Sequence, residues 1–507
     1  MGSSSISSML RLSGMSTGLD TDSIIQSLMT VEQTKVDRVF RQQTLAEWKL
    51  AAHKAINSQI SAFRNANMSV LSGTNLFTTS AFNIFNVNLP TATGSVSLTA
   101  GAGAQAGDMQ IDNITRIAKA SSTASAAPLT AGSTVSLTAQ LGSLELARPI
   151  TFGGANADEV SFAINGETFT FKNTDTLQTV FNTINASSTI NVSISYSELT
   201  NAIQIKTRDT GAATALTIEN LTGNLFGADS AFAIGTGTIQ NGQDALLSIN
   251  GVSVTRSIND FTIDGVNYRL KSASAVPINF TVERNTDATV DKIKNYVTEY
   301  NKLVDALQSS VSEAVYRDYS PLTDAQKEEM SEKDIEAWET KAKSGLLRND
   351  RNLGDLLGDL RAMLYETVAG TSLSLSAIGL RTGSYYDHGK ISLDEQALRA
   401  ALARDPDQVT RLFTQTSQSA DPATQYAESG FLTRVNSAFT AYTKTYSLTE
   451  ADQEIARLKQ QVSDLTDQMV DKEEQYYKRF TAMETAISTM NAQSSWLTMQ
   501  FSANSGK

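Results

Sequence analysis

The residues that could take part in catalysis or metal binding are few. The two histidines, His53 and His388, are far apart in the sequence, and neither lies in a His-Glu-x-x-His motif or another zinc-ligand spacing. The carboxylates Asp20 and Asp22 could bind a cation, but capping of a helix explains the pair better. No serine lies in a Gly-x-Ser-x-Gly motif. The sequence therefore predicts no catalytic residue and no metal site, and we expect the protein not to be an enzyme.

A glycine-rich segment at residues 101–107 has a superficial likeness to a dinucleotide-binding loop. Its glycine spacing is wrong for that role, and residues 109–111 have the pattern of a strand rather than of a helix. A flexible turn is the better interpretation, so no cofactor is expected.

Charge and composition limit the partners. The 507 residues have a formal net charge of −12, and no cluster of Lys and Arg is present. Because phosphate binding requires clustered cations, we expect neither nucleic acid nor an anionic membrane as a partner. No stretch approaches the roughly 20 apolar residues of a membrane span, and residues 1–18 lack the apolar core of a Sec signal peptide. Cysteine is absent, so stability must come from packing and assembly.

Helical patterns occupy both ends of the chain. The first helix is predicted to begin at 19–23, where Asp20 can cap it. A second helical stretch covers 48–63 and should end near Gly73. Helix returns at about Thr286. In the charged insert at 318–343, residues 323–326 and 331–334 both resemble capping boxes and predict two helix starts. Further helices are predicted at 353–366 and 394–413, the last interrupted or ended around Asp405-Pro406.

The middle of the chain, about 79–280, has the alternating pattern of antiparallel strands. Asn165-Gly166 and Asn250-Gly251 each join two alternating runs, which is the strongest short-range signal for a β-hairpin. One short helix is predicted at 175–184. The predicted class is therefore α+β and multidomain, with helical terminal segments, a helical inner domain and inserted antiparallel β-rich domains.

The C-terminal helix has a narrow apolar stripe of the coiled-coil type, which requires a partner helix. That partner is either the N-terminal helix or another chain, and we favour a surface that is completed on assembly. The predicted assembly interface consists of apolar residues of both terminal helices: Leu19, Ile24, Ile25, Leu28, Val31, Ile455, Leu458, Val462, Leu465, Met469, Phe480, Met483, Ile487, Met490, Leu497 and Phe501.

Several segments follow one another in an order known from one protein family. They are Gly-Leu-Asp-Thr-Asp at 18–22, then 116–120, 162–205, Gly-Gln-Asp-Ala at 242–245, 249–252, 291–303, 346–350, 378–380, 389–394 and 475–501. In order and spacing they resemble the flagellar hook-associated protein 2, or filament cap (FliD), family. Residues 141–151 and 318–343 have no close match to it.

The resemblance implies discontinuous domains, because the chain runs outward and returns. The implied division is a terminal helical or coiled-coil leg, a mainly helical inner domain, a β-rich domain and a β-rich outer domain with a flagellin-type repeat. These parts are expected at 1–45 with 450–507, 46–83 with 283–449, 84–150 with 241–282, and 151–240.

The resemblance also implies partners and a location. We expect a homo-oligomeric ring at the distal tip of the bacterial flagellum, outside the cell, which retains exported flagellin and promotes its polymerisation. Implied contacts are flagellin, hook–filament junction proteins, an export chaperone at the C-terminal helix and host glycans on exposed loops. Export is expected through the flagellar type III channel, without a cleaved signal. Two alternative functions are an adhesin for mucin or glycans mounted on the filament tip, and another axial protein of the flagellum.

Overall fold

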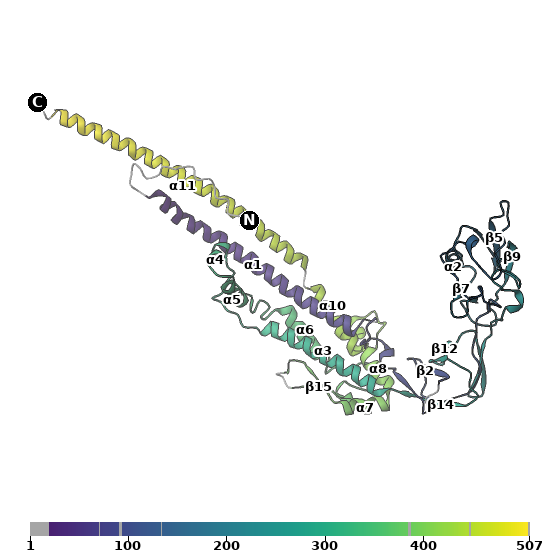
Figure 1. Cartoon of the computed structure of the whole chain (residues 1–507). Helices are drawn as coiled ribbons and strands as arrows, with labels where there is room; N and C mark the ends of the chain where they lie inside the picture. The colour runs from purple at the N-terminus through teal and green to yellow at the C-terminus, as the bar shows by residue number, and fades with distance from the viewer. Residues whose placement is uncertain are drawn as a thin grey trace. The chain divides into compact units, whose positions relative to one another are not determined.

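The structure, a computed structural model, describes residues 20–69, 71–90, 94–132, 134–383, 387–445 and 448–504. It contains two compact units, one formed by Met1–Thr79 with Val290–Lys507 and the other by Ser80–Thr289. The first is mainly helical and the second consists mainly of antiparallel strands (Figure 1). The predicted α+β multidomain class is therefore confirmed.

In the helical unit, two long helices lie side by side: α1 (Thr21–Asn67) and α11 (Leu448–Asn504) (Figure 1). The remaining elements of this unit are shorter. They are α3 (Thr286–Ser312), α4 (Asp324–Glu328), α5 (Glu332–Lys343), α6 (Arg351–Ala362), the 3₁₀ helix η4 (Ser376–Ile378), β15 (Leu380–Thr382), β16 (Ile391–Leu393), α7 (Glu395–Arg404), α8 (Pro406–Thr414), α9 (Pro422–Glu428) and α10 (Phe431–Thr445).

Helix α1 is one continuous helix of 47 residues, where the sequence analysis predicted two helical stretches. It begins as predicted, because Oδ1 of Asp20 accepts a hydrogen bond from the backbone N–H of Ser23 at 3.0 Å. It remains unbroken because residues 21–67 contain neither glycine nor proline. It ends at Asn67, before the predicted stop at Gly73, and it crosses the predicted domain boundary at residue 45.

Aromatic side chains form much of the core of the helical unit. The ring of Phe63 on α1 lies 5.5 Å from that of Tyr296 on α3 and 5.7 Å from that of Phe439 on α10. Such edge and tilted contacts are favourable beyond the burial of the rings. The predicted break at Asp405-Pro406 is also present: Asp405 ends α7, and its carboxylate accepts a hydrogen bond from Gln408 N–H at the start of α8.

The charged insert is a small folded element rather than only a solvated helix surface. Its two short helices have the predicted caps, with a capping box at Thr323 and a side-chain cap at Ser331. The ring of Trp338 lies 4.7 Å from that of Tyr319, which provides the insert with a local aromatic contact. The ammonium of Lys343 lies 4.8 Å above the ring of Trp48, so the insert contacts the middle of α1.

The strand-rich unit contains four sheets among its described residues. Its elements are η1 (Thr79–Ala81), β1 (Phe85–Asn88), β2 (Val96–Ala100), β3 (Gly107–Arg116), β4 (Ser122–Ala124), η2 (Leu141–Ser143), β5 (Glu159–Ile164), β6 (Glu167–Lys172), α2 (Leu177–Ala186), β7 (Val192–Ser197), β8 (Ala202–Thr207), β9 (Ile218–Thr222), η3 (Thr236–Thr238), β10 (Ala245–Ile249), β11 (Val252–Arg256), β12 (Asp260–Ile263), β13 (Val266–Leu270) and β14 (Ile278–Arg284). The strand orders are β1-β14-β3-β10-β11, β12-β13-β2, β4-β8-β7 and β6-β5-β9; the remaining pair, β15-β16, belongs to the helical unit.

Both predicted hairpins are present. Asn165-Gly166 joins β5 to β6 and Asn250-Gly251 joins β10 to β11, with positive φ at all four residues, as a type I′ turn requires. A third hairpin of the same kind, Asp264-Gly265 between β12 and β13, was not predicted. The predicted short helix corresponds to α2.

The glycine-rich segment at 101–107 connects β2 to β3 and packs against this third hairpin. The backbone N–H of Gly101 donates a hydrogen bond to the carbonyl oxygen of Gly265 at 2.8 Å. Because strands precede and follow the segment, it lacks the helix start that a dinucleotide-binding loop requires. A turn is the interpretation that fits.

Two clusters of buried apolar residues lie in the strand-rich unit. One surrounds Phe162 and the other surrounds Tyr268. The first includes Leu129, Val135 and Leu141, which the sequence-based division placed in the neighbouring domain. The division into four domains stays a prediction.

Candidate assembly interface

The two terminal helices are joined in a defined antiparallel register. Nζ of Lys472 lies 2.8 Å from Oε2 of Glu32, and Nζ of Lys459 lies 3.0 Å from Oε1 of Glu47. Later residues of α11 thus lie opposite earlier residues of α1. Hydrogen bonds from Lys35 and Lys472 lower the pKa of the Glu32 carboxyl, and the bond to Glu32 raises the pKa of Lys472.

Apolar residues line the seam between these helices. On α11, Ile455 and Leu458 are buried. On α1, Ile25, Val36 and Val39 are buried. The sequence analysis did not select Val36 and Val39. Their spacing could have indicated them, because Val36 follows Glu32 by four residues and Val39 follows Val36 by three, as on one side of a helix.

The residues of the predicted interface fall into three groups by exposure. Ile25, Ile455 and Leu458 are buried in the seam. Partly buried are Val462, Leu465, Met469, Phe480 and Ile487. Exposed are Ile24, Leu28, Val31, Met483, Met490, Leu497 and Phe501. Leu19 lies outside the described residues. Over the first half of α11 the stripe therefore has its partner, α1, within the same chain.

The exposed members on α1 occupy a different side of the helix from the seam. Ile24, Leu28 and Val31 are 38%, 37% and 59% exposed, whereas the adjacent Ile25 is 1% exposed. At about 100° of rotation per residue, the three side chains lie roughly a quarter turn away from Ile25. Helix α1 therefore presents a second apolar surface in its first turns.

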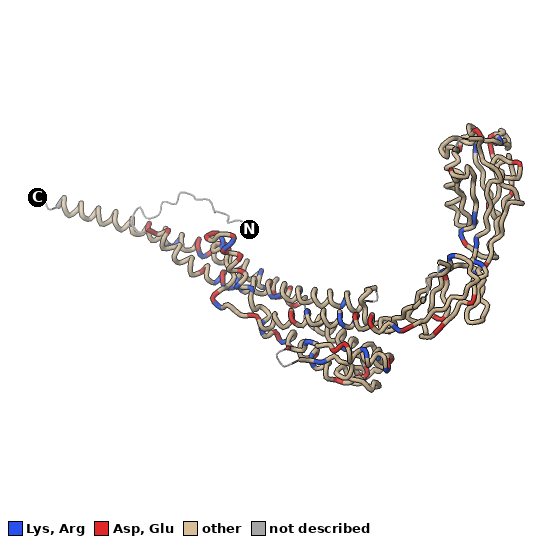
Figure 2. The backbone as a smooth tube through the Cα atoms, turned by 60° about the horizontal axis from the view of Figure 1, so that its bottom comes forward, with Lys and Arg blue, Asp and Glu red and all other residues tan. Residues whose placement is uncertain are grey.

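The end of α11 is apolar and uncharged. Residues 485–504 include no Asp, Glu, Lys or Arg, and Figure 2 shows the same end of the helix free of charged residues. Met490 is 64% exposed, Trp496 58% and Leu497 47%. A charge-free helix surface with this many large apolar side chains is typical of a site for protein contact.

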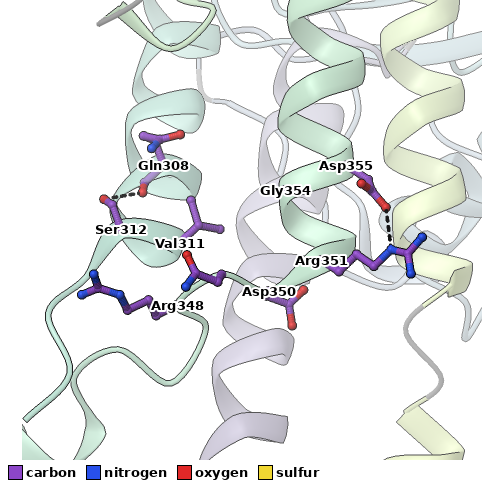
Figure 3. A pocket seen from close by; sticks show the side chains of 9 residues that line it. Gln308, Val311, Ser312, Arg348, Asp350, Arg351, Gly354 and Asp355 are labelled. Carbon is purple, nitrogen blue, oxygen red and sulfur yellow. Dashed lines mark hydrogen bonds and ion pairs between the residues drawn. The ribbon is translucent and has the colours of Figure 1, made fainter.

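An open pocket of about 600 Å³ lies between the end of α3 and the start of α6 (Figure 3). Its charged residues bond within the chain: Arg348 Nη1 donates to the carbonyl oxygen of Glu313 at 3.1 Å, and Arg351 Nε lies 3.8 Å from Asp355 Oδ2. Asp350 Oδ1 accepts a hydrogen bond from Leu353 N–H at 3.1 Å and caps α6. These bonds fix the turn before α6, which supports a structural role.

The two histidines have different surroundings. His53 is fully buried, with Nε2 3.3 Å from Asp350 Oδ2 and Nδ1 3.3 Å from the hydroxyl of Tyr442. Burial lowers the pKa of His53 from its ordinary value of 6.5, and the Asp350 carboxylate opposes this shift. His388 adopts a positive φ of 52° in the turn before β16. Among the described residues, no group of three or more His, Asp or Glu side chains has an arrangement suited to a metal ion.

In the described ranges, no helix combines the length and the apolar character that crossing a bilayer requires.

Comparison with known proteins places this arrangement in one family. A family model described as "Flagellar hook-associated protein 2 N-terminus" matches residues 17–121, and one described as "Flagellar hook-associated protein 2 C-terminus" matches residues 242–492. Together they cover α1, α11 as far as residue 492 and most of the chain between these helices. The chain belongs to the flagellar hook-associated protein 2 family.

Relatives in this family match nearly the whole chain. Flagellar hook-associated protein 2 of Halalkalibacterium halodurans is 28% identical over 535 residues, which cover 96% of this chain and 98% of the relative. That of Escherichia coli K12 is 24% identical over 508 residues, covering 97% and 98%. The crystal structure of the D1-D2-D3 domains of the E. coli flagellar cap protein FliD has a similar fold, with a TM-score of 0.52, 20% identity and coverage of 79% of this chain and 97% of that one.

Hook-associated protein 2 is the flagellar filament cap. The chain is therefore a structural component of the bacterial flagellum that caps the filament at its distal tip, outside the cell. Members of this family act with other flagellar components and as oligomers, so the surfaces of the two terminal helices become candidates for such contacts.

Proposed function

We propose that several copies of this chain form a closed ring at the filament end, and that the ring retains exported flagellin and promotes its polymerisation. The role is that of a non-enzymatic scaffold. The observation that supports it best is the leg formed by α1 and α11, in which one apolar seam is filled within the chain while two further apolar surfaces are exposed. Large exposed apolar surfaces at a helix end favour packing against other proteins of the filament.

The proposed partners follow from these surfaces. The leg contacts flagellin and, before filament growth, the hook–filament junction proteins. During export, the uncharged segment 485–504 is the proposed site for a chaperone, because such a segment would otherwise expose its apolar side chains to water. The interface residues named from the sequence keep this proposed role, with Leu19 lying outside the described residues.

Deletion of this chain in its own cell tests the proposal. We expect filaments to be lost and soluble flagellin to accumulate in the medium, with both effects reversed when the chain is restored. The measurement is the amount of flagellin in sheared filaments against that in the cell-free medium. Normal filament growth without the chain would contradict the proposal.

A second candidate function, glycan binding, is favoured by a groove in the strand-rich unit. This open cavity of about 670 Å³ is lined largely by Asn and Thr side chains and includes Asp209 and Ile258. Asn191 Nδ2 donates a hydrogen bond to Asp209 Oδ2 at 2.8 Å, which holds the polar groups at one edge. Full-length chain with Asn191→Ala should lose binding on a glycan array while filament growth in cells stays normal. Unchanged array binding would argue against this site.

A further inference from the structure

The second apolar surface of α1 lies on the same side of the helix as residues that the chain's own helices cover further along. Ile60 follows Ile24 by about ten helical turns, so the two side chains lie on the same side of α1. At Ile60 this side is fully buried, and nearby Phe63 packs against α3 and α10. On this side of α1, Ile60 is covered by helices of the same unit. The exposed Ile24, Leu28 and Val31 form a separate apolar surface in the first turns, because the polar Lys35, Arg38 and Gln42 lie between the two on the same side.

The end of α11 presents a complementary surface. Because Lys472 lies opposite Glu32, the first residue of α1, Thr21, lies opposite about residue 484. The remaining 20 residues of α11 extend roughly 30 Å further at 1.5 Å per residue. Met483, Met490 and Leu497 are spaced by seven residues, and each is exposed. A spacing of seven positions them on one side of the helix, as a packing seam requires.

We propose that the Met483–Met490–Leu497 side of α11 in one copy packs on the Ile24–Leu28–Val31 surface of α1 in the next copy. This inference rests on the proposed function as an assembled cap, and it names the surfaces that join the copies. The two surfaces belong to different helices, so each copy can use one surface on each of two neighbours, and such head-to-tail repetition gives a ring when the rotation between copies closes. Because residues 485–504 have no charged side chain, the contact buries no unpaired charge there.

Disulfide trapping tests this contact directly, because the chain contains no cysteine. In the full-length variant Leu28→Cys/Met490→Cys, position 28 of one copy lies opposite about residue 477 of α11. Within one copy, position 490 is therefore about 20 Å from position 28 along the helix axis. This distance is well beyond the roughly 7 Å limit between the Cα atoms of a disulfide. A bond between the two positions therefore reports a contact between copies.

We expect oxidation of the double variant to produce a ladder of covalent multimers on a non-reducing gel. Each single variant, Leu28→Cys or Met490→Cys, should give no species larger than a dimer. The pair Leu199→Cys/Met490→Cys controls for random collision, because Leu199 is 96% exposed and lies in the strand-rich unit. Only monomer with an internal bond, or a ladder no stronger than in this control, would overturn the inference.

The variant Leu28→Asp/Val31→Asp separates this inference from the proposed capping function. We expect it to retain its helix content by circular dichroism and to run as a monomer in size-exclusion chromatography, while Leu199→Asp remains oligomeric. Oligomers that are unchanged in the variant would overturn the inference. If filaments still grow in that case, the capping function still stands. If filaments fail to grow, the result favours a flagellin helix as the occupant of this surface. A monomeric variant that still supports normal filaments would uphold the contact between copies and contradict capping by a ring.

Discussion

Nζ of Lys472 lies 2.8 Å from Oε2 of Glu32, and this contact joins two residues that are 440 positions apart in the sequence. Glu32 is largely buried at its side chain, with 14% exposed, and it also bonds to Lys35 on its own helix at 2.7 Å. A carboxylate between two ammonium groups fixes the register of α1 against α11. The register in turn determines which apolar residues are buried in the seam and which are exposed.

Reversal of one charge at this contact should loosen the leg. Lys472→Glu places two carboxylates opposite each other, so we expect a lower melting temperature of the leg helices and a loss of hydrogen-exchange protection in residues 21–36. The swap Glu32→Lys/Lys472→Glu should recover only part of the loss, because the new ammonium at position 32 also faces Lys35, and it should recover less at high salt because ions screen the attraction. Equal protection in the single variant and the wild type would show that the apolar seam alone sets the register.

Removal of a buried apolar side chain should cost more than removal of a polar side chain at the surface. Leu458→Ala creates a cavity in the seam at a residue that is 5% exposed, and we expect it to destabilise the leg by about 2 kcal/mol or more. Gln461→Ala, on the exposed side of the same helix, is the matched control and should change little. Denaturant unfolding followed by hydrogen exchange of α11 provides the measurement. Equal effects of the two variants would contradict the assignment of the seam.

Local signals in the sequence predicted much of the fold. The cap at Asp20, the capping box at Thr323 and the hairpin at Asn165-Gly166 depend on residues that are close in sequence, so their chemistry can be recognised there. The Asp264-Gly265 hairpin provided the same kind of signal and was overlooked.

The assignment of faces on the terminal helices could not be predicted in the same way. Ile24 and Ile25 are adjacent and equally apolar, yet one is 38% exposed and the other 1%. Helical periodicity fits either residue into a stripe, and only the position of α11 against α1 decides between them. The single continuous α1 was not predicted either, although residues 21–67 contain no glycine or proline that would end a helix.

The Asp264-Gly265 turn provides a test of close packing in the strand-rich unit. Gly265 has a φ of 77°, and a Cβ atom there would lie 2.3 Å from the backbone nitrogen of Ala104. Gly166, in a turn of the same type, has a φ of 85° but no atom within 4 Å of such a Cβ. Gly166→Ala should therefore cost about 1 kcal/mol for the left-handed conformation alone, whereas Gly265→Ala adds a backbone clash and should cost clearly more.

Hydrogen exchange of the full-length chain distinguishes these two glycine variants. We expect Gly265→Ala to lose protection in β12, β13 and the 101–107 segment, while Gly166→Ala loses a little protection only in β5 and β6. If the two variants lost protection to the same extent, the contact between Gly265 and the 101–107 segment would not contribute measurably to the stability of the unit.

The surroundings of His53 make the stability of the helical unit depend on pH. His53 is buried among α1, the start of α6 and α10, where it faces Asp350 and Tyr442, and Lys49 lies 3.8 Å from the same Asp350 oxygen. Burial lowers the pKa of His53 below 6.5, and Lys49 adds to this shift while Asp350 opposes it. Below pH 6.5 the unfolded chain therefore binds a proton on this side chain more readily than the folded chain does.

The sign of the effect follows from proton linkage. Since the unfolded state binds more protons, the free energy of unfolding should fall as pH drops below about 6.5, by up to about 1.4 kcal/mol per pH unit, until the folded pKa is passed. All three tryptophans, Trp48, Trp338 and Trp496, lie in the helical unit, so urea unfolding followed by tryptophan fluorescence reports on this unit. His53→Gln should reduce the difference in stability between pH 7.5 and pH 5.5, while His388→Gln should retain it. The same difference in His53→Gln as in the wild type would assign the pH dependence to other groups of the helical unit.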